Sequence, residues 1–113
     1  MRFLLAIAFT FSLTPLTAKA ETQAERDERR AGYFAGFSCS TIVRGQAMTI
    51  RYLDGGIGRI EFQEDDIAMK WRVKDDRFCR QIGTSEERCW NLGSKSPADE
   101  KEKMQAVLRK NCL

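Results

Sequence analysis

Four cysteines are the residues of this sequence most able to do chemistry. They are Cys39, Cys79, Cys89 and Cys112, and the chain contains no histidine. A zinc site is disfavoured, because the sequence has neither a Cys-x-x-Cys pair nor a histidine ligand. An even number of cysteines in a short chain with an export signal instead indicates two disulfides. We therefore expect two disulfides, no metal site and no cofactor.

Local geometry distinguishes among the three possible disulfide pairings. If residues 83–85 form the loop of a hairpin, Cys79 lies directly opposite Cys89. Directly opposed residues have Cβ atoms about 4.5–5.5 Å apart, which is close to the roughly 3.5–4.5 Å that a disulfide needs. We therefore expect Cys79–Cys89, which leaves Cys39–Cys112 to join the first strand to a C-terminal helix. The second bridge closes a long loop and in the chain-entropy treatment stabilises by about 4–5 kcal/mol.

Catalytic residues are harder to find. Without histidine, neither a Ser/His/Asp nor a Cys/His arrangement is possible. The carboxylates of 64–66 and of Asp75 and Asp76 lie where strands are expected to end, and aspartate is a favoured turn residue. The glycines of 55–58 fall inside a hairpin, which differs from the strand-to-helix setting of a phosphate-binding loop. We expect no catalytic residue and no enzyme; the alternative is a small cell-wall or glycan hydrolase that uses the turn carboxylates.

Basic residues mark a candidate binding surface. Strand alternation places Lys70, Arg72 and Lys74 on one side of a sheet, and Arg77 joins them after a turn. Several cations on a rigid surface favour an acidic partner protein, a polysaccharide or an anionic envelope component. Solvated cations that discourage edge-to-edge pairing are the alternative interpretation. These four residues are our predicted partner-binding site.

The first twenty residues predict export. Arg2 supplies a positive start, 3–13 are almost wholly apolar, Pro15 breaks a helix, and Ala18 and Ala20 precede a cleavage site. The apolar run is much shorter than the roughly 20 residues of a membrane span. Residues 1–20 are therefore expected to be a signal peptide cleaved near Ala20. The protein would then be periplasmic or secreted, without a stable membrane anchor.

The charge that remains after cleavage is nearly balanced. The whole chain has 19 Lys and Arg against 16 Asp and Glu; the leader contains two of the basic residues and no acidic one, which leaves 17 against 16. A near-neutral protein has no overall field for nucleic acid, so we expect no nucleic-acid partner. The remaining length suits one small domain over 31–113, which would be marginally stable without crosslinks.

Two patterns divide the chain that follows the leader. The segment 21–30 is highly charged and lacks an apolar stripe, which predicts a charged N-terminal tail or the start of a helix. Phe34 and Phe37 then favour a short helix over 31–37 that docks on the domain. From Cys39 to Leu92 apolar and polar residues alternate, most clearly over 67–74. Such alternation indicates strands with one buried and one exposed face.

Turn lengths predict antiparallel hairpins whose large apolar residues share a face. A three-residue loop at 54–56, with a glycine in the left-handed position, and a two-residue turn at 75–76 both bring apolar residues opposite one another. The last hairpin does the same. The expected pairs are Leu53 with Ile57, Ile50 with Ile60, Met48 with Phe62, Val73 with Phe78, Met69 with Ile82, and Phe78 with Trp90. The agreement of all three registers indicates a genuine meander.

The end of the chain predicts a helix. Ser96 suits the N-cap and Pro97 the first helical position. An apolar stripe follows, and 109–110 place two cations at the negative end of the dipole. The stripe consists of Met104, Val107 and Leu108. We predict an α+β fold: a small antiparallel β-meander of five or six strands, curled or barrel-like, with a C-terminal helix, a short N-terminal helix and two disulfides.

Three short motifs carry a resemblance. Tyr52-Leu53-Asp54-Gly55, Trp71-Arg72-Val73 and the Cys79…Cys89 hairpin resemble small exported proteobacterial domains of unknown function, although Met69 stands where their strand has glycine. The resemblance covers residues 52–92 and implies a small β-domain without an established activity. A cysteine strand followed by an alternating tyrosine strand is also faintly similar to periplasmic lysozyme inhibitors of the small-barrel kind, although their Ser-Gly-rich inhibitory loop is missing.

These observations favour a binding protein over an enzyme. We expect an exported, non-enzymatic binding or accessory protein of the cell envelope that acts on a partner protein as a subunit or an inhibitor.

Overall fold

A computed structural model describes residues 20–112, so the predicted signal sequence, apart from Ala20, lies outside the described residues. The elements are α1 (Gln23–Phe34), β1 (Ser38–Val43), β2 (Gln46–Leu53), η1 (Asp54–Gly56), β3 (Ile57–Phe62), β4 (Asp65–Lys74), β5 (Arg77–Ile82), β6 (Arg88–Asn91) and α2 (Glu100–Lys110). In the described part of the chain, no helix is long and apolar enough to cross a membrane.

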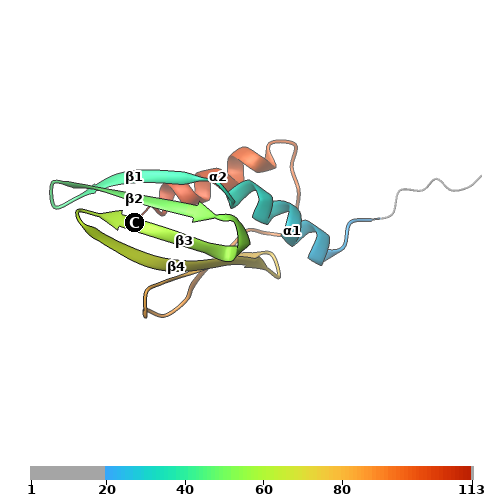
Figure 1. The fold of residues 1–113 in the computed structure, drawn as a ribbon. Helices are drawn as coiled ribbons and strands as arrows, with labels where there is room; N and C mark the ends of the chain where they lie inside the picture. Colours follow the sequence, from blue (N-terminus) through green and yellow to red (C-terminus); the bar gives the residue numbers. More distant parts are fainter. Residues whose placement is uncertain (1–19, 113) are drawn as a thin grey trace, which may run out of the picture.

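The six strands form one antiparallel sheet in the order β1-β2-β3-β4-β5-β6. The sheet curls into a half-barrel, and both helices pack on its concave side (Figure 1). The predicted α+β meander with an N-terminal and a C-terminal helix is confirmed. Because neighbours along the chain are neighbours in the sheet, β1 and β6 are its two edges.

The predicted registers are also confirmed. Every expected apolar pair, from Met48 with Phe62 to Phe78 with Trp90, is a bridge partner pair. Both turns have the required left-handed backbone: φ is 80° at Gly55, 77° at Gly56, and 55° and 59° at Asp75 and Asp76. A Cβ at Gly56 would lie 2.9 Å from the carbonyl oxygen of Trp71, so that turn also needs glycine for close packing.

The core lies between the concave face and the helices. Phe34 of α1 is fully buried and packs against Phe78 at 4.9 Å and Trp71 at 6.4 Å between ring centroids. Tyr52 meets both of these rings edge-on. Met104 and Leu108 of α2 are buried in the same cluster, while Val107 is half-buried at the edge of the stripe. Two of the three residues of the predicted stripe therefore face the sheet.

Both predicted disulfides are present. Cys39–Cys112 joins β1 to the end of α2 across 73 residues of chain. Cys79–Cys89 joins directly opposed residues of β5 and β6. Each bridge therefore ties one edge region of the sheet.

The charged segment 21–30 is a helix rather than a tail. Helix α1 begins at Gln23 with a capping box, in which the Thr22 hydroxyl accepts from the Glu25 backbone and the Glu25 carboxylate accepts from the Thr22 backbone. Its inward stripe is ionic: Asp27 and Arg30 are buried. Of the two alternatives for 21–30, the start of a helix is the one observed, and the helix ends at Phe34 rather than at 37, because charged side chains extend the docked face toward the N-terminus.

Arg30 is the centre of this ionic stripe and is fully buried. Its Nε donates to the Glu100 carboxylate at 3.0 Å, and its Nη1 donates to Asp76 at 3.1 Å. Its other bonds reach the carbonyl oxygens of Gly93 and Lys95 at 2.8 and 2.9 Å. One side chain thus joins α1, the β4–β5 turn, the loop after β6 and the start of α2. A buried arginine is tolerated when it is paired and fully hydrogen-bonded in this way.

The predicted start of α2 was wrong. The helix begins at Glu100 with Asp99 as its N-cap, and Asp99 makes no side-chain capping bond. The Ser96 hydroxyl instead accepts from Nη2 of Arg29 at 3.0 Å. The Glu100 carboxylate binds Arg29 and Arg30. These contacts with α1 explain why the helix starts later than local capping preferences predict.

Candidate functional site

The predicted basic residues do share a face. Lys70, Arg72 and Lys74 are exposed on the convex side of β4, and Arg77 lies opposite Lys74 on β5. Arg72, however, donates from Nε and Nη2 to both oxygens of Glu87 at 3.0 and 2.8 Å. This pairing raises the pKa of Arg72. The convex face therefore presents fewer uncompensated cations than the strand pattern indicates.

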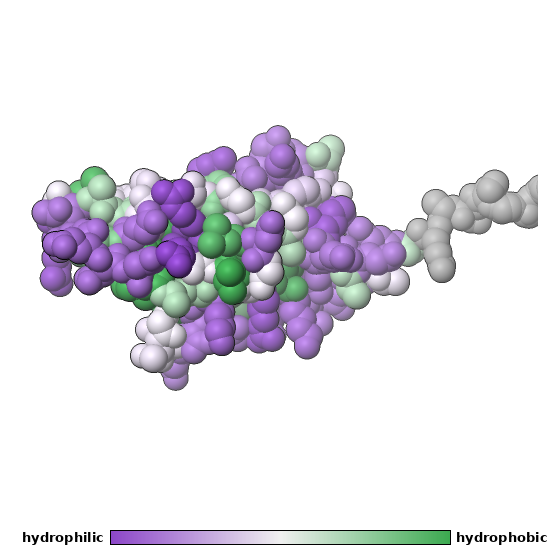
Figure 2. Space-filling view, viewed as in Figure 1, coloured by the Kyte–Doolittle hydropathy of each residue, from purple (hydrophilic) through white to green (hydrophobic). Residues whose placement is uncertain are grey.

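Neighbouring strands continue this mixture of charges. Arg51 pairs with Glu61 and Arg59 with Asp66 across the convex face. Figure 2 shows a mostly hydrophilic surface with small hydrophobic areas between the polar groups. Exposed pairs of this kind contribute little to stability. They also reduce the net positive charge that the convex face presents.

Among the turn carboxylates, Asp76 has structural partners. Both oxygens of Asp76 accept from Arg26, at 2.7 and 2.8 Å, which lowers the pKa of Asp76. The Asp27 carboxylate accepts from the backbone N–H groups of Asp75 and Asp76. A carboxylate with a lowered pKa stays ionised, so Asp76 is unsuited to donate a proton as a general acid. The Asp75-Asp76 turn is thus an anchor for α1.

One group of possible metal ligands occurs in residues 20–112, formed by Cys79, Cys89 and Glu87. Its two sulfur atoms are bonded to each other in the disulfide. Metal binding by cysteine needs a thiolate, which a disulfide does not offer. The group therefore does not form a metal site while the disulfide is intact.

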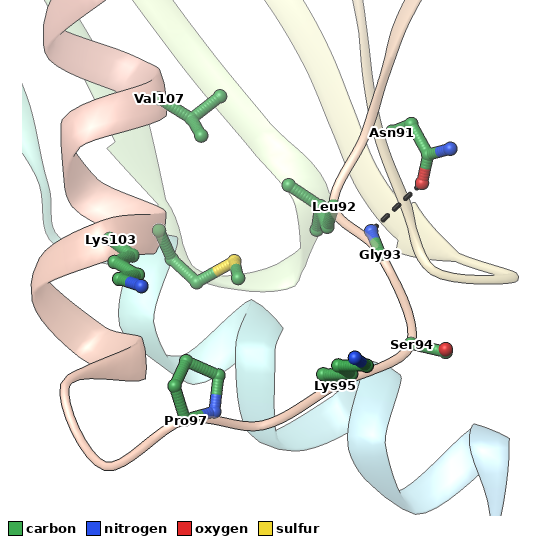
Figure 3. Close-up of a pocket in the computed structure, with 9 residues that line it drawn as sticks. Asn91, Leu92, Gly93, Ser94, Lys95, Pro97, Lys103 and Val107 are labelled. Atoms are coloured by element: carbon green, nitrogen blue, oxygen red, sulfur yellow. Dashed lines mark hydrogen bonds between the residues drawn. The ribbon is translucent and has the colours of Figure 1, made fainter.

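An open groove of about 440 Å³ lies between α2 and the loop that follows β6 (Figure 3). Leu92, Met104 and Val107 supply its apolar surface, and Lys95 and Lys103 also line it. A hydrogen bond within its lining runs from the Gly93 backbone to the Asn91 side chain at 2.8 Å. Nothing in the groove specifies an occupant.

The free edge of β1 is a more specific feature. Tyr52 donates its backbone N–H to Phe37, and the Tyr52 carbonyl accepts from Gly36. Hydrogen-bonded and non-bonded pairs alternate along an antiparallel ladder. With the observed register, the residues bonded to β2 after Phe37 are Cys39, Thr41 and Val43. The N–H and C=O groups of the three alternate residues, Ser38, Ser40 and Ile42, therefore point away from the sheet.

This edge lacks the features that usually protect one. Residues 38–43 contain no charge and no proline, and Ile42 is 67% exposed, the highest value among the large exposed apolar residues of the described chain. Natural proteins usually protect sheet edges with charges, proline, short strands or covering elements. The six residues of β1 are therefore a template onto which another strand can pair.

A cavity of about 470 Å³ adjoins the same edge. It is lined by Phe37, Ser38, Ser40, Arg109 and the Cys39–Cys112 disulfide. The Arg109 guanidinium lies over the Phe37 ring, 5.5 Å from its centroid. The cavity thus combines an aromatic surface with a cation directly beside exposed backbone groups. We define this edge and cavity together as the β1 edge site.

The predicted basic face did not include the β1 edge site, although the composition of residues 38–43 is a sequence signal for it. The first strand of a meander occupies one edge of its sheet, and β1 is the first strand of residues 20–112. The predicted Cys39–Cys112 bridge also brings the end of the C-terminal helix near the first strand, but the contact of Arg109 with Phe37 depends on the packing of α2.

Comparisons of this chain with protein-family models, with curated proteins and with solved structures find no match.

Proposed function

We propose that this chain is an exported, non-enzymatic binding domain of the cell envelope that acts as a subunit or inhibitor of a partner protein. The partner adds an extended segment to β1 as a seventh strand. The observation that carries this proposal is the outward-facing backbone of Ser38, Ser40 and Ile42 on an uncharged edge. Strand addition uses such groups for affinity, and adjacent side-chain pockets supply specificity.

The surroundings of the edge favour a segment with an acidic residue. Arg109 lines the cavity beside β1, and Arg44 lies in the exposed turn at its other end. A second copy of β1 has the sequence SCSTIV, which offers no carboxylate to either arginine. Charge complementarity across an interface favours the partner that supplies the opposite sign. A foreign acidic segment therefore fits this edge better than self-pairing does.

Two further observations support the location and the class. The two disulfides belong to an oxidising compartment, which agrees with the predicted leader. Two of the turn carboxylates that favoured a hydrolase, Asp66 and Asp76, are engaged in ion pairs. The convex cations Lys70, Lys74 and Arg77 lie on β4 and β5, away from the β1 edge, so we assign them no part in strand addition.

A photo-crosslinking amino acid in place of Ile42, expressed in the native host, tests the proposal. We expect one defined adduct at this position and none from the same probe at Gln81, on the convex side of β5. Ser40→Pro removes an outward N–H without breaking the β1–β2 ladder and should abolish the adduct. Ser40→Ala keeps the N–H and should retain it.

Three results would contradict strand addition. The adduct could survive Ser40→Pro, the probe at Gln81 could give the same adduct as the probe at Ile42, or no adduct could form at Ile42. An adduct of twice the chain's mass would indicate that the partner is a second copy of this chain.

A further inference from the structure

Arg80 is a second buried arginine, with surroundings very different from those of Arg30. It is 3% exposed, and its alternation along β5 places it on the concave face between Phe78 and Ile82. Within residues 20–112 its side chain makes one hydrogen bond, from Nη1 to the Tyr52 hydroxyl at 2.7 Å, and no ion pair. Its Nε is buried without a hydrogen-bond partner. A buried guanidinium without a counter-ion is costly.

A second cation lies directly beside it. Arg80 of β5 and Arg88 of β6 are bridge partners, so their side chains project from opposed positions on the same face. Like charges at directly opposed positions destabilise a sheet. Both guanidinium groups lie over the Trp90 ring, at 4.9 and 5.3 Å from its centroid. The ring partly stabilises both cations but cannot neutralise them.

Other arginines of the same molecule show which group the unpaired side of the Arg80 guanidinium can bind. Arg26, Arg29 and Arg72 each donate from Nε and Nη2 to the two oxygens of one carboxylate, at 2.7–3.0 Å. In Arg80 the bond to Tyr52 uses Nη1 and leaves the Nε–Nη2 edge without a protein acceptor among the described residues. That edge matches a carboxylate in planar, bidentate geometry.

The space for such a group is present. A cavity of about 190 Å³ is lined by Arg80, Arg88, Ile82, Ser85 and Glu86. Ile82 gives it an apolar wall, and Glu86 places a negative charge at its exposed rim. A rim carboxylate repels a doubly charged phosphate more strongly than a singly charged carboxylate.

We propose that the cavity between Arg80 and Arg88 binds a small carboxylate-bearing ligand. The carboxylate accepts from Nη2 of Arg80, and from the buried Nε once a small rotation of the guanidinium opens this atom to the cavity; Arg88 supplies the second positive charge at the mouth. This site lies at the β6 end of the sheet and is independent of strand addition at β1, so either proposal can fail without the other.

The test follows the Nε–H signal of Arg80 by NMR during titration of the purified mature protein with acetate and with succinate, at constant ionic strength. We expect a saturable shift of this signal. Arg80→Lys keeps the charge but loses the bidentate edge, and should weaken binding roughly tenfold or more. Arg88→Gln should weaken it less, while Arg77→Gln, which removes a cation from the convex face of β5, should leave it unchanged.

Several outcomes would overturn the proposal. The Arg80 signal could fail to shift in the wild-type protein, which needs no variant to fold. Arg77→Gln could weaken the response as much as Arg88→Gln does, which would indicate general attraction of anions. Inorganic phosphate could bind as tightly as the carboxylates, which would contradict the assigned ligand class. Glu86→Gln should strengthen binding, and a loss of binding there would contradict the assigned role of Glu86 as a repulsive rim charge.

Discussion

The two edges of the sheet end in different ways. Strand β1 has six uncharged residues whose outward backbone groups are open. Strand β6 has four residues, begins with Arg88, and is bonded to β5 by Cys79–Cys89. The chain leaving β6 is held by Arg30 through Gly93 and Lys95. The β1 region, by contrast, is tied to α2 by the Cys39–Cys112 disulfide.

This difference separates an edge that is open to a further strand from one that resists pairing. A short, charged and anchored edge resists edge-to-edge pairing, as β6 does. An open edge carries a risk of aggregation, which a protein accepts more readily where the edge has a use. We therefore place partner binding at β1 and small-ligand binding at the β5–β6 hairpin.

Removing either disulfide should give the largest loss of stability, and the two losses should differ between the two edges of the sheet. In the chain-entropy treatment, replacing Cys39 and Cys112 by alanine costs about 4–5 kcal/mol of unfolding free energy, because the bridge closes a long loop. Replacing Cys79 and Cys89 costs about 3 kcal/mol. Urea unfolding of both double variants measures the difference. Equal losses, or a larger loss for Cys79 and Cys89, would contradict the order.

Arg30→Met should cost roughly 3–5 kcal/mol, because it removes the shared partner of Glu100 and Asp76 and frees two carbonyl oxygens. Arg80→Met is the matched control. It replaces a similarly buried arginine that has no counter-ion among the described residues, and we expect a change within about 1 kcal/mol or a gain. Thermal or urea unfolding of the two variants gives the comparison. A loss for Arg80→Met as large as that for Arg30→Met would mean that Arg80 is a structural residue.

Proline placed at adjacent positions of β1 should show which backbone groups are free. Thr41→Pro removes an N–H that bonds to β2 and should cost about 1–3 kcal/mol. Ser40→Pro removes an outward N–H and should cost less than about 1 kcal/mol. Chemical unfolding measures both. If Ser40→Pro were the more damaging variant, the outward assignment of Ser40 would be wrong.

Acid should loosen the β6 side before the β1 side. Hydrogen bonding to Arg26 lowers the pKa of Asp76 below its ordinary value of 3.8. The resulting stabilisation is present above the unfolded-state pKa and is lost as the pH falls through the lower folded-state value. The backbone of Asp76 also accepts from Leu92, just after β6. Amide exchange at a pH below the ordinary aspartate value should therefore lose protection first around Leu92.

Asp76→Asn is the control for this acid effect. The variant should be less stable at neutral pH and should lack the part of the acid dependence that Asp76 causes. An unchanged acid dependence in the variant would show that other carboxylates dominate.

The sequence predicted the sheet well because the information for it is local. Loop length, left-handed turn residues and alternation together determined registers such as Val73 with Phe78, and the register of the last hairpin then indicated Cys79–Cys89. The start of α1 stayed open between a tail and a helix because the docked face of this part is ionic rather than apolar. Arg26, Arg30 and Phe34 follow the four-residue spacing of one helix face, so this pattern was available in the sequence.

Other features depended on contacts between distant segments. Ser96 was a reasonable N-cap by residue type, but its hydroxyl accepts from Arg29 on another helix. The predicted basic face was correct in position, yet Glu87 from the β5–β6 loop neutralises Arg72. The inward position of Arg80 could be predicted, since alternation places it on the same face as Phe78 and Ile82. The lack of a counter-ion could not be predicted, because only the folded chain shows which acids come near.

Hydrogen exchange along β1 tests the central claim most directly. In the isolated mature protein, the amides of Ser38, Ser40 and Ile42 should exchange as exposed groups at every protein concentration, while those of Cys39, Thr41 and Val43 are protected. When the partner captured through Ile42 is added, the three exposed amides should become protected. Protection of all six amides in the isolated chain, or continued rapid exchange of the outward three in the complex, would contradict strand addition at β1.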